Sequence, residues 1–68
     1  MLRNDVPSVT INDVVIPGEA KGLLRVCIAG RELEYCPMQH VKEFYQSKDG
    51  RSDYLVVATW FAVDRGWV

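Results

Sequence analysis

The sequence lacks an excess of either charge. Eight lysines and arginines stand against nine aspartates and glutamates, so the net charge is −1, and neither sign gathers in one segment. Proteins that bind nucleic acid normally carry a basic stripe facing the phosphates, and a mimic of DNA would need a strong acidic excess. We therefore expect no direct contact with nucleic acid.

The sequence also lacks a hydrophobic run long enough to cross a membrane. Its most apolar stretch, Tyr54–Val63, has ten residues, whereas a transmembrane helix needs about 20. The first residues, Met1–Asp5, lack the apolar segment of a secretory signal peptide. We expect no membrane partner and a cytoplasmic location, which would be the host cytoplasm if a phage encodes the chain.

Residues that carry chemistry are scarce. Cys27, Cys36 and His40 are the only cluster of soft metal ligands, but structural zinc sites need four ligands and usually take two closely spaced cysteines. A Cys36–His40 thiol–imidazole pair has no evident third group to orient it, and no glycine-rich loop is present to hold phosphate. We expect no metal, no cofactor, no catalytic residue and no small-molecule substrate, hence a protein that is not an enzyme. A small metal- or thiol-dependent enzyme is the alternative.

What the chain does have is apolar side chains in one short domain, residues 1–68, of which 49% are hydrophobic. This share excludes disorder for most of the chain. A domain of this size buries only about 60% of the surface that its unfolded chain exposes. Its stability is expected to be marginal unless a disulfide, a metal or a partner chain contributes.

The first half predicts β-hairpins. Val9–Ile11 and Val14–Ile16 are β-branched runs that flank Asn12-Asp13, which favours a tight hairpin or, alternatively, one longer strand with a bulge. Residues 23–29 alternate between two faces and are expected to pair with residues 31–36 through a two-residue Gly30-Arg31 turn. In that register the apolar cross-strand pairs are Ile28–Leu33 and Val26–Tyr35.

The same register bears on the cysteines. Cys27 would oppose Glu34, which makes Cys36 a diagonal neighbour at the far limit of disulfide geometry. The cytoplasm also keeps thiols reduced. Both cysteines are therefore expected to be reduced and free of metal.

The second half predicts two helices. Pro37 suits a first helical position, and Met38, Val41 and Phe44 follow at helical spacing, which indicates a helix near residues 37–47. A second helix is expected near residues 53–65. Its start signals are Ser52 and Asp53 and its stop signals Arg65 and Gly66.

The predicted fold class is therefore α+β, a small antiparallel sheet of one or two β-hairpins followed by a two-helix hairpin. The residue types of Tyr54–Val63 also favour a strand. The alternative is a ββαβ fold in which residues 54–63 form a central strand paired with residues 23–29.

The aromatic C-terminal end predicts a contact surface. A helix over residues 53–65 would bury one side under the sheet and leave Trp60, Val63 and Trp67 on another side, with Asp64 and Arg65 as a polar rim. Interfaces are enriched in tryptophan, tyrosine and arginine. These five residues are the predicted partner-binding residues. Alternatively, Trp60 folds under the first hairpin and Trp67 closes the edge of the core.

The small size and the layout of short hairpins followed by an apolar helix resemble proteins encoded by phages and mobile elements. No motif carries this resemblance. It implies a protein-binding module that occupies a surface on a larger host complex, as anti-CRISPR inhibitors do. The alternative that it implies is a phage structural subunit or assembly chaperone that self-associates.

Overall fold

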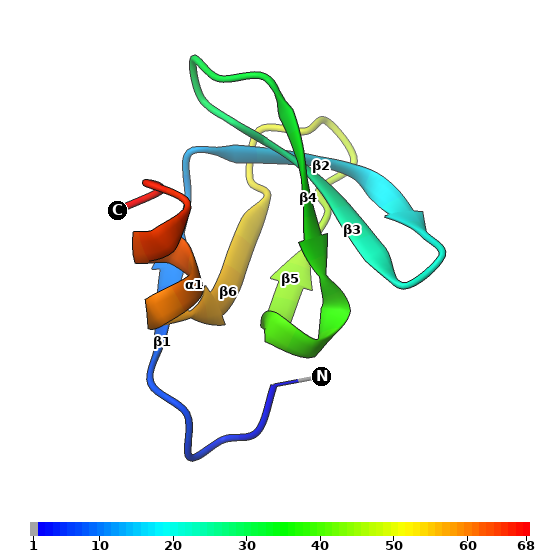
Figure 1. Ribbon diagram of the computed structural model, residues 1–68. Helices are drawn as coiled ribbons and strands as arrows, with labels where there is room; N and C mark the ends of the chain where they lie inside the picture. The colour runs from blue at the N-terminus through cyan, green and yellow to red at the C-terminus, as the bar shows by residue number, and fades with distance from the viewer. Residues whose placement is uncertain (1) are drawn as a thin grey trace.

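Six strands form two three-stranded antiparallel sheets in the computed structural model, which describes residues 2–68 (Figure 1). The first sheet has the strand order β1–β6–β5 and the second the order β2–β3–β4. One turn of 3-10 helix, η1, lies between β4 and β5, and the helix α1 follows β6. The bounds are β1 Ser8–Ile11, β2 Val14–Ala20, β3 Leu23–Ile28, β4 Leu33–Pro37, η1 Met38–His40, β5 Val41–Tyr45, β6 Tyr54–Ala58 and α1 Thr59–Asp64.

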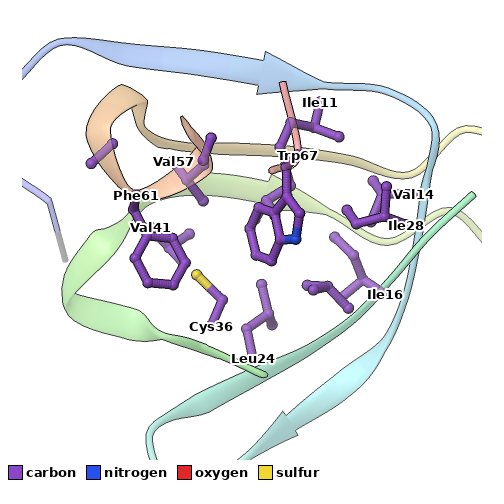
Figure 2. Packing of buried hydrophobic residues seen from close by; sticks show 14 residues of the cluster. Ile11, Val14, Ile16, Leu24, Ile28, Cys36, Val41, Val57, Phe61 and Trp67 are labelled. Atoms are coloured by element: carbon purple, nitrogen blue, oxygen red, sulfur yellow. The ribbon is translucent and has the colours of Figure 1, made fainter. Parts of the chain in front are cut away.

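The core lies between the two sheets and is closed at one side by α1 (Figures 1 and 2). Alternate residues of the central strands point inward, because successive side chains of a strand face opposite ways. Those with no exposed surface include Leu24 and Val26 of β3 and Leu55 and Val57 of β6. The core therefore depends on side chains from both sheets, and neither sheet could bury its inner face alone.

The expected hairpin around Asn12-Asp13 is wrong, and so is the single bulged strand. The chain turns a corner there and passes from one sheet to the other: β1 pairs with β6, whereas β2 pairs with β3. The corner is held by the amide of Ala29, which donates to the carbonyl oxygen of Asp13 at 2.8 Å. β-Branched residues on both sides favour strands but do not say which strands pair.

Antiparallel strands at residues 23–29 and 31–36 are confirmed as β3 and β4, but their predicted register is off by one residue. Cys27 pairs with Leu33, and Val26 pairs with Glu34. The connection is longer than a two-residue turn, and the amide of Arg31 donates to Ile28 O at 2.9 Å. A register that differs by one residue exchanges the two faces of a strand. Leu33, which was expected on the buried face, therefore points outward.

The predicted helix over residues 37–47 is also wrong. Pro37 ends β4, a single 3-10 turn follows, and Val41–Tyr45 is the strand β5. The register of β5 against β6 shifts between Val41 and Glu43. This bulge inserts one residue and brings Val41 and Phe44 to the same face three positions apart, which is a helical spacing.

The predicted helix over residues 53–65 begins six residues later, at Thr59. Tyr54–Ala58 is the strand β6, and α1 starts at Thr59 with no side-chain cap. The α+β class is therefore wrong: the described chain is 48% strand with one short helix. The ββαβ alternative fails as well. β6 is a central strand, as that alternative expected, but it pairs with β1 and β5 and not with residues 23–29, and Thr59–Asp64 is helical.

The carboxylate of Asp53 joins the two sheets instead of capping a helix. It accepts hydrogen bonds from the amide of Ile16 in β2 at 2.8 Å, and from the amide and hydroxyl of Ser47 at 2.8 and 2.7 Å. Gln46 donates to the carbonyl oxygen of Ile16 at 2.9 Å. The edge of β2 is thus satisfied by side chains from around the β5–β6 connection, and Asp53 is only 4% exposed.

Candidate interaction surface

The end of α1 decides where the predicted contact residues lie. The amide of Gly66 donates to Val63 O at 3.0 Å, and the amide of Trp67 donates to Ala62 O at 2.8 Å. Gly66 has a φ of 73°, a left-handed conformation that favours glycine. This is the Schellman arrangement at a helix end. The expected stop at Arg65 and Gly66 is confirmed, and the reversal that it makes turns Trp67 back toward the core.

Trp67 is buried between the sheets, with 8% of its surface exposed (Figure 2). Its indole N–H donates to Glu34 Oε2 at 3.1 Å. Arg31 holds the same end of the chain: its guanidinium donates to the carbonyl oxygens of Gly66 at 2.7 Å and Arg65 at 3.2 Å. Trp67 therefore belongs to the core and is not available as part of a contact surface.

Trp60 and Val63, by contrast, are exposed. They lie three positions apart in α1, so their side chains are neighbours on the helix surface, and they are 56% and 58% exposed. Asp64 and Arg65 are also exposed. The structure thus brings together four of the five predicted residues. We name Trp60, Val63, Asp64 and Arg65 the α1 surface.

The ring of Trp60 is held by two other rings. It meets His40 of η1 edge-on, with ring centroids 4.9 Å apart and planes at 82°, and it meets Phe61 edge-on at 5.7 Å and 90°. His40 in turn stacks on Phe61 at 4.8 Å. Edge-to-face contacts at these distances are favourable, so the exposed indole has a defined orientation.

Phe61 connects this surface to the core. It is 4% exposed, and its ring meets that of Trp67 edge-on at 5.5 Å. The guanidinium carbon of Arg65 lies 5.1 Å from the centroid of Phe61, a cation–π distance. The α1 surface is therefore supported from beneath by a residue that cannot move without disturbing the core.

His40 is the functional candidate that sequence reasoning missed as part of this surface. Its sequence context suggests a metal ligand, a partner of a thiol or a surface histidine at a helix start, and none of these places it beside Trp60. Its place beside Trp60 follows from η1, where the chain crosses from the second sheet to the first. No spacing in the sequence connects residues 40 and 60, because their contact depends on the pairing of β5 with β6.

A thiol–imidazole nucleophile is not supported by the environment of Cys36. Its side chain has no exposed surface, and burial raises the pKa of the thiol to about 11, although the charge of Arg65 acts in the opposite direction. Because the thiolate is the reactive form, Cys36 is protonated and inert near neutral pH. Cys27 lies half-buried on the opposite face of the same sheet.

This difference predicts selective alkylation. With iodoacetamide at pH 7.5, Cys27 is expected to react in the native protein, whereas Cys36 should react only after unfolding in denaturant. Peptide mass spectrometry after a timed reaction distinguishes the two sites. Alkylation of Cys36 at a rate equal to that of Cys27 in the native state would contradict its burial.

Other sites offer less. Within residues 2–68, no three histidine, cysteine, aspartate or glutamate side chains are arranged to hold a metal ion. A cleft of about 330 Å³ lies between the ends of β1 and β3 and the C-terminal end, and Asp13 is the one ionisable side chain among its lining residues. Such a lining provides no acid–base pair. None of the helices in residues 2–68 has the length and apolar character that crossing a membrane requires.

Comparison of the chain with protein-family models, with curated proteins and with solved structures gave no match. The α1 surface therefore stands on its own geometry.

Proposed function

We propose that this chain is a small non-enzymatic protein-binding module that occupies a surface on a larger protein, with Trp60 as its main anchor. The observation that carries the proposal is an indole that is 56% exposed and yet fixed by His40 and Phe61. Tryptophan is among the residues that contribute most to interfaces. A side chain that is already oriented loses less conformational entropy on binding.

The remaining residues of the α1 surface fit the same role. Val63 adds apolar area beside Trp60, while Asp64 and Arg65 supply the polar rim that surrounds the centre of an interface. The partner would be a host complex if a phage encodes the chain. The resemblance to phage proteins rested on a predicted layout of hairpins and helices that the structure contradicts. The support for binding is therefore the α1 surface alone. The proposal includes a cytoplasmic location, where both thiols stay reduced.

The test is the substitution Trp60→Ala. In a quantitative pull-down from lysate of the source organism, followed by titration with the captured protein, the variant is expected to bind about 30-fold more weakly, which corresponds to about 2 kcal/mol. Its melting temperature should stay close to that of the wild type, because an exposed side chain contributes little to stability.

Tyr45→Ala is the matched control. Tyr45 is 49% exposed and stacks on Tyr54, 5.8 Å away, so it is another exposed aromatic ring held by a neighbour. The variant Tyr45→Ala should leave binding to the captured protein unchanged. Equal binding by wild type and Trp60→Ala would refute the proposal. A wild-type mass in solution that corresponds to a large ring, reduced to the monomer by Trp60→Ala, would instead assign the surface to self-association.

A further inference from the structure

A second surface lies on the outer side of the β2–β3–β4 sheet, away from α1. In an antiparallel sheet, paired residues of neighbouring strands share a face. One row across the three strands is Val15–Cys27–Leu33, and the next is Gly18–Arg25–Tyr35. We name these six residues the outer face. α1 packs against β1 and β6, and Figure 1 shows it on the far side of the molecule from β3 and β4.

The outer face is apolar apart from one charge. Val15, Leu33 and Tyr35 are 46%, 45% and 52% exposed, and they surround the single ionised side chain of the two rows, Arg25. Soluble domains seldom leave such a patch open unless it binds something. The observed β3–β4 register produces this patch, since it pairs Leu33 with Cys27 and Tyr35 with Arg25 and so turns Leu33 and Tyr35 outward.

Arg25 lies flat across the sheet. A methyl group added at Gly18 would come within 3.0 Å of Arg25 Nη2, so the guanidinium occupies the space that a side chain at position 18 would take. Its Nε is buried and has no hydrogen-bond partner within residues 2–68. The ion pairs of that part of the chain involve Arg3 and Arg31, not Arg25.

The burial of Arg25 Nε is costly, because this atom loses water and gains no acceptor, and no carboxylate within residues 2–68 forms an ion pair with the guanidinium. A carboxylate matches the planar guanidinium better than any neutral acceptor does. We propose that the outer face binds a protein segment that presents one aspartate or glutamate carboxylate to Arg25 and packs apolar side chains around it against Val15, Leu33 and Tyr35.

The position of the charge argues against a second copy of the chain as the occupant. A two-fold symmetric pair uses the same patch on both partners. Arg25 is on the middle strand of the patch, and none of the six residues of the outer face is acidic, so such a pair would bring two guanidinium groups together with no carboxylate from the patch to pair with them. The outer face therefore selects a different chain, and it does so independently of the α1 surface.

The probe is a displayed library of random 12-residue peptides, selected on the full chain. Selected peptides are expected to contain an aspartate or glutamate flanked by apolar residues, and changing that residue to its amide should weaken binding at least tenfold. Amide chemical-shift changes on titration should gather on β2, β3 and β4. Arg25→Met, which keeps the length and removes the charge, should lose binding at least tenfold, while Trp60→Ala should bind as the wild type does.

Tyr35→Ser is a second variant, for use if Arg25→Met does not fold, because Tyr35 is at an exposed position of an edge strand. It should also weaken peptide binding at least tenfold. The proposal is overturned if no peptide is enriched over selection without the chain, if the selected peptides share no carboxylate, or if their shift changes lie on the α1 surface. Concentration-dependent dimers that Tyr35→Ser abolishes would also overturn it, in favour of self-association.

Discussion

Replacing Trp67 by alanine is expected to lower the free energy of unfolding by about 3–5 kcal/mol, the usual cost of deleting a buried large aromatic side chain. A chain of this length has a total stability of only several kcal/mol. Trp67→Ala should therefore populate the unfolded state strongly at 25 °C. Urea denaturation followed by far-UV circular dichroism measures the loss.

The size of this effect follows from three contacts. The indole packs edge-on against Phe61, fills the space between the two sheets, and donates a hydrogen bond to Glu34 that a smaller residue cannot make. Trp60→Ala is the matched control, because it removes a side chain of the same type from an exposed position on α1. A loss for Trp67→Ala no larger than that for Trp60→Ala would show that Trp67 is not in the core.

Replacing Asp53 by alanine is expected to cost about 3 kcal/mol. The change removes three hydrogen bonds to a carboxylate and leaves the amides of Ile16 and Ser47 without their acceptor. Buried donors that lose a partner cost about 1–3 kcal/mol each, and hydrogen bonds to charged groups are at the stronger end. Thermal unfolding of the variant and the wild type at pH 7 measures the difference.

Asp53 also predicts how stability depends on acid. The hydrogen bond from the Ser47 hydroxyl, followed by those from the amides of Ile16 and Ser47, lowers the pKa of this carboxyl in the folded state. In the unfolded chain an aspartate titrates near pH 3.9. The contribution of Asp53 is therefore fully present above about pH 4 to 5 and is lost as the pH falls through the lowered folded-state pKa.

Asp53→Asn should remove part of this dependence, so that melting temperature falls less steeply between pH 5 and pH 2 than in the wild type. Asp13→Asn is the control, since Asp13 is exposed at the corner between β1 and β2. An acid transition of unchanged steepness in Asp53→Asn would show that this carboxylate does not stabilise the folded state.

The strands that could be predicted from the sequence are those whose faces alternate without interruption. β3 alternates between buried and partly exposed residues along its whole length, and its position was confirmed. β5 contains a bulge that places Val41 and Phe44 at a helical spacing. Periodicity alone cannot distinguish a bulged strand from a helix turn, because both put residues three apart on one face.

The start and stop signals around residues 53–65 are real features of the chain, but the predicted role of the start signal was wrong. Gly66 does end a helix. In a Schellman turn the apolar residue that follows the glycine packs back against the helix. This rule, applied to Trp67, could have placed its side chain in the core. Asp53 is an aspartate near a chain turn, as expected of a cap, but its hydrogen bonds go to Ile16 and Ser47. Those partners depend on how the two sheets pack, which local sequence does not specify.

The pairing of β1 with β6 has a consequence for folding during synthesis. Ser8 pairs with Ala58, so β1 is synthesised well before β6, the strand with which it pairs. The β2–β3–β4 sheet, whose strands are consecutive in the chain, can form first. β1 and β5 must wait as single strands until β6 arrives between them. Because such distant pairings slow folding, the interval in which their edges are open is the period when this chain is most exposed to aggregation.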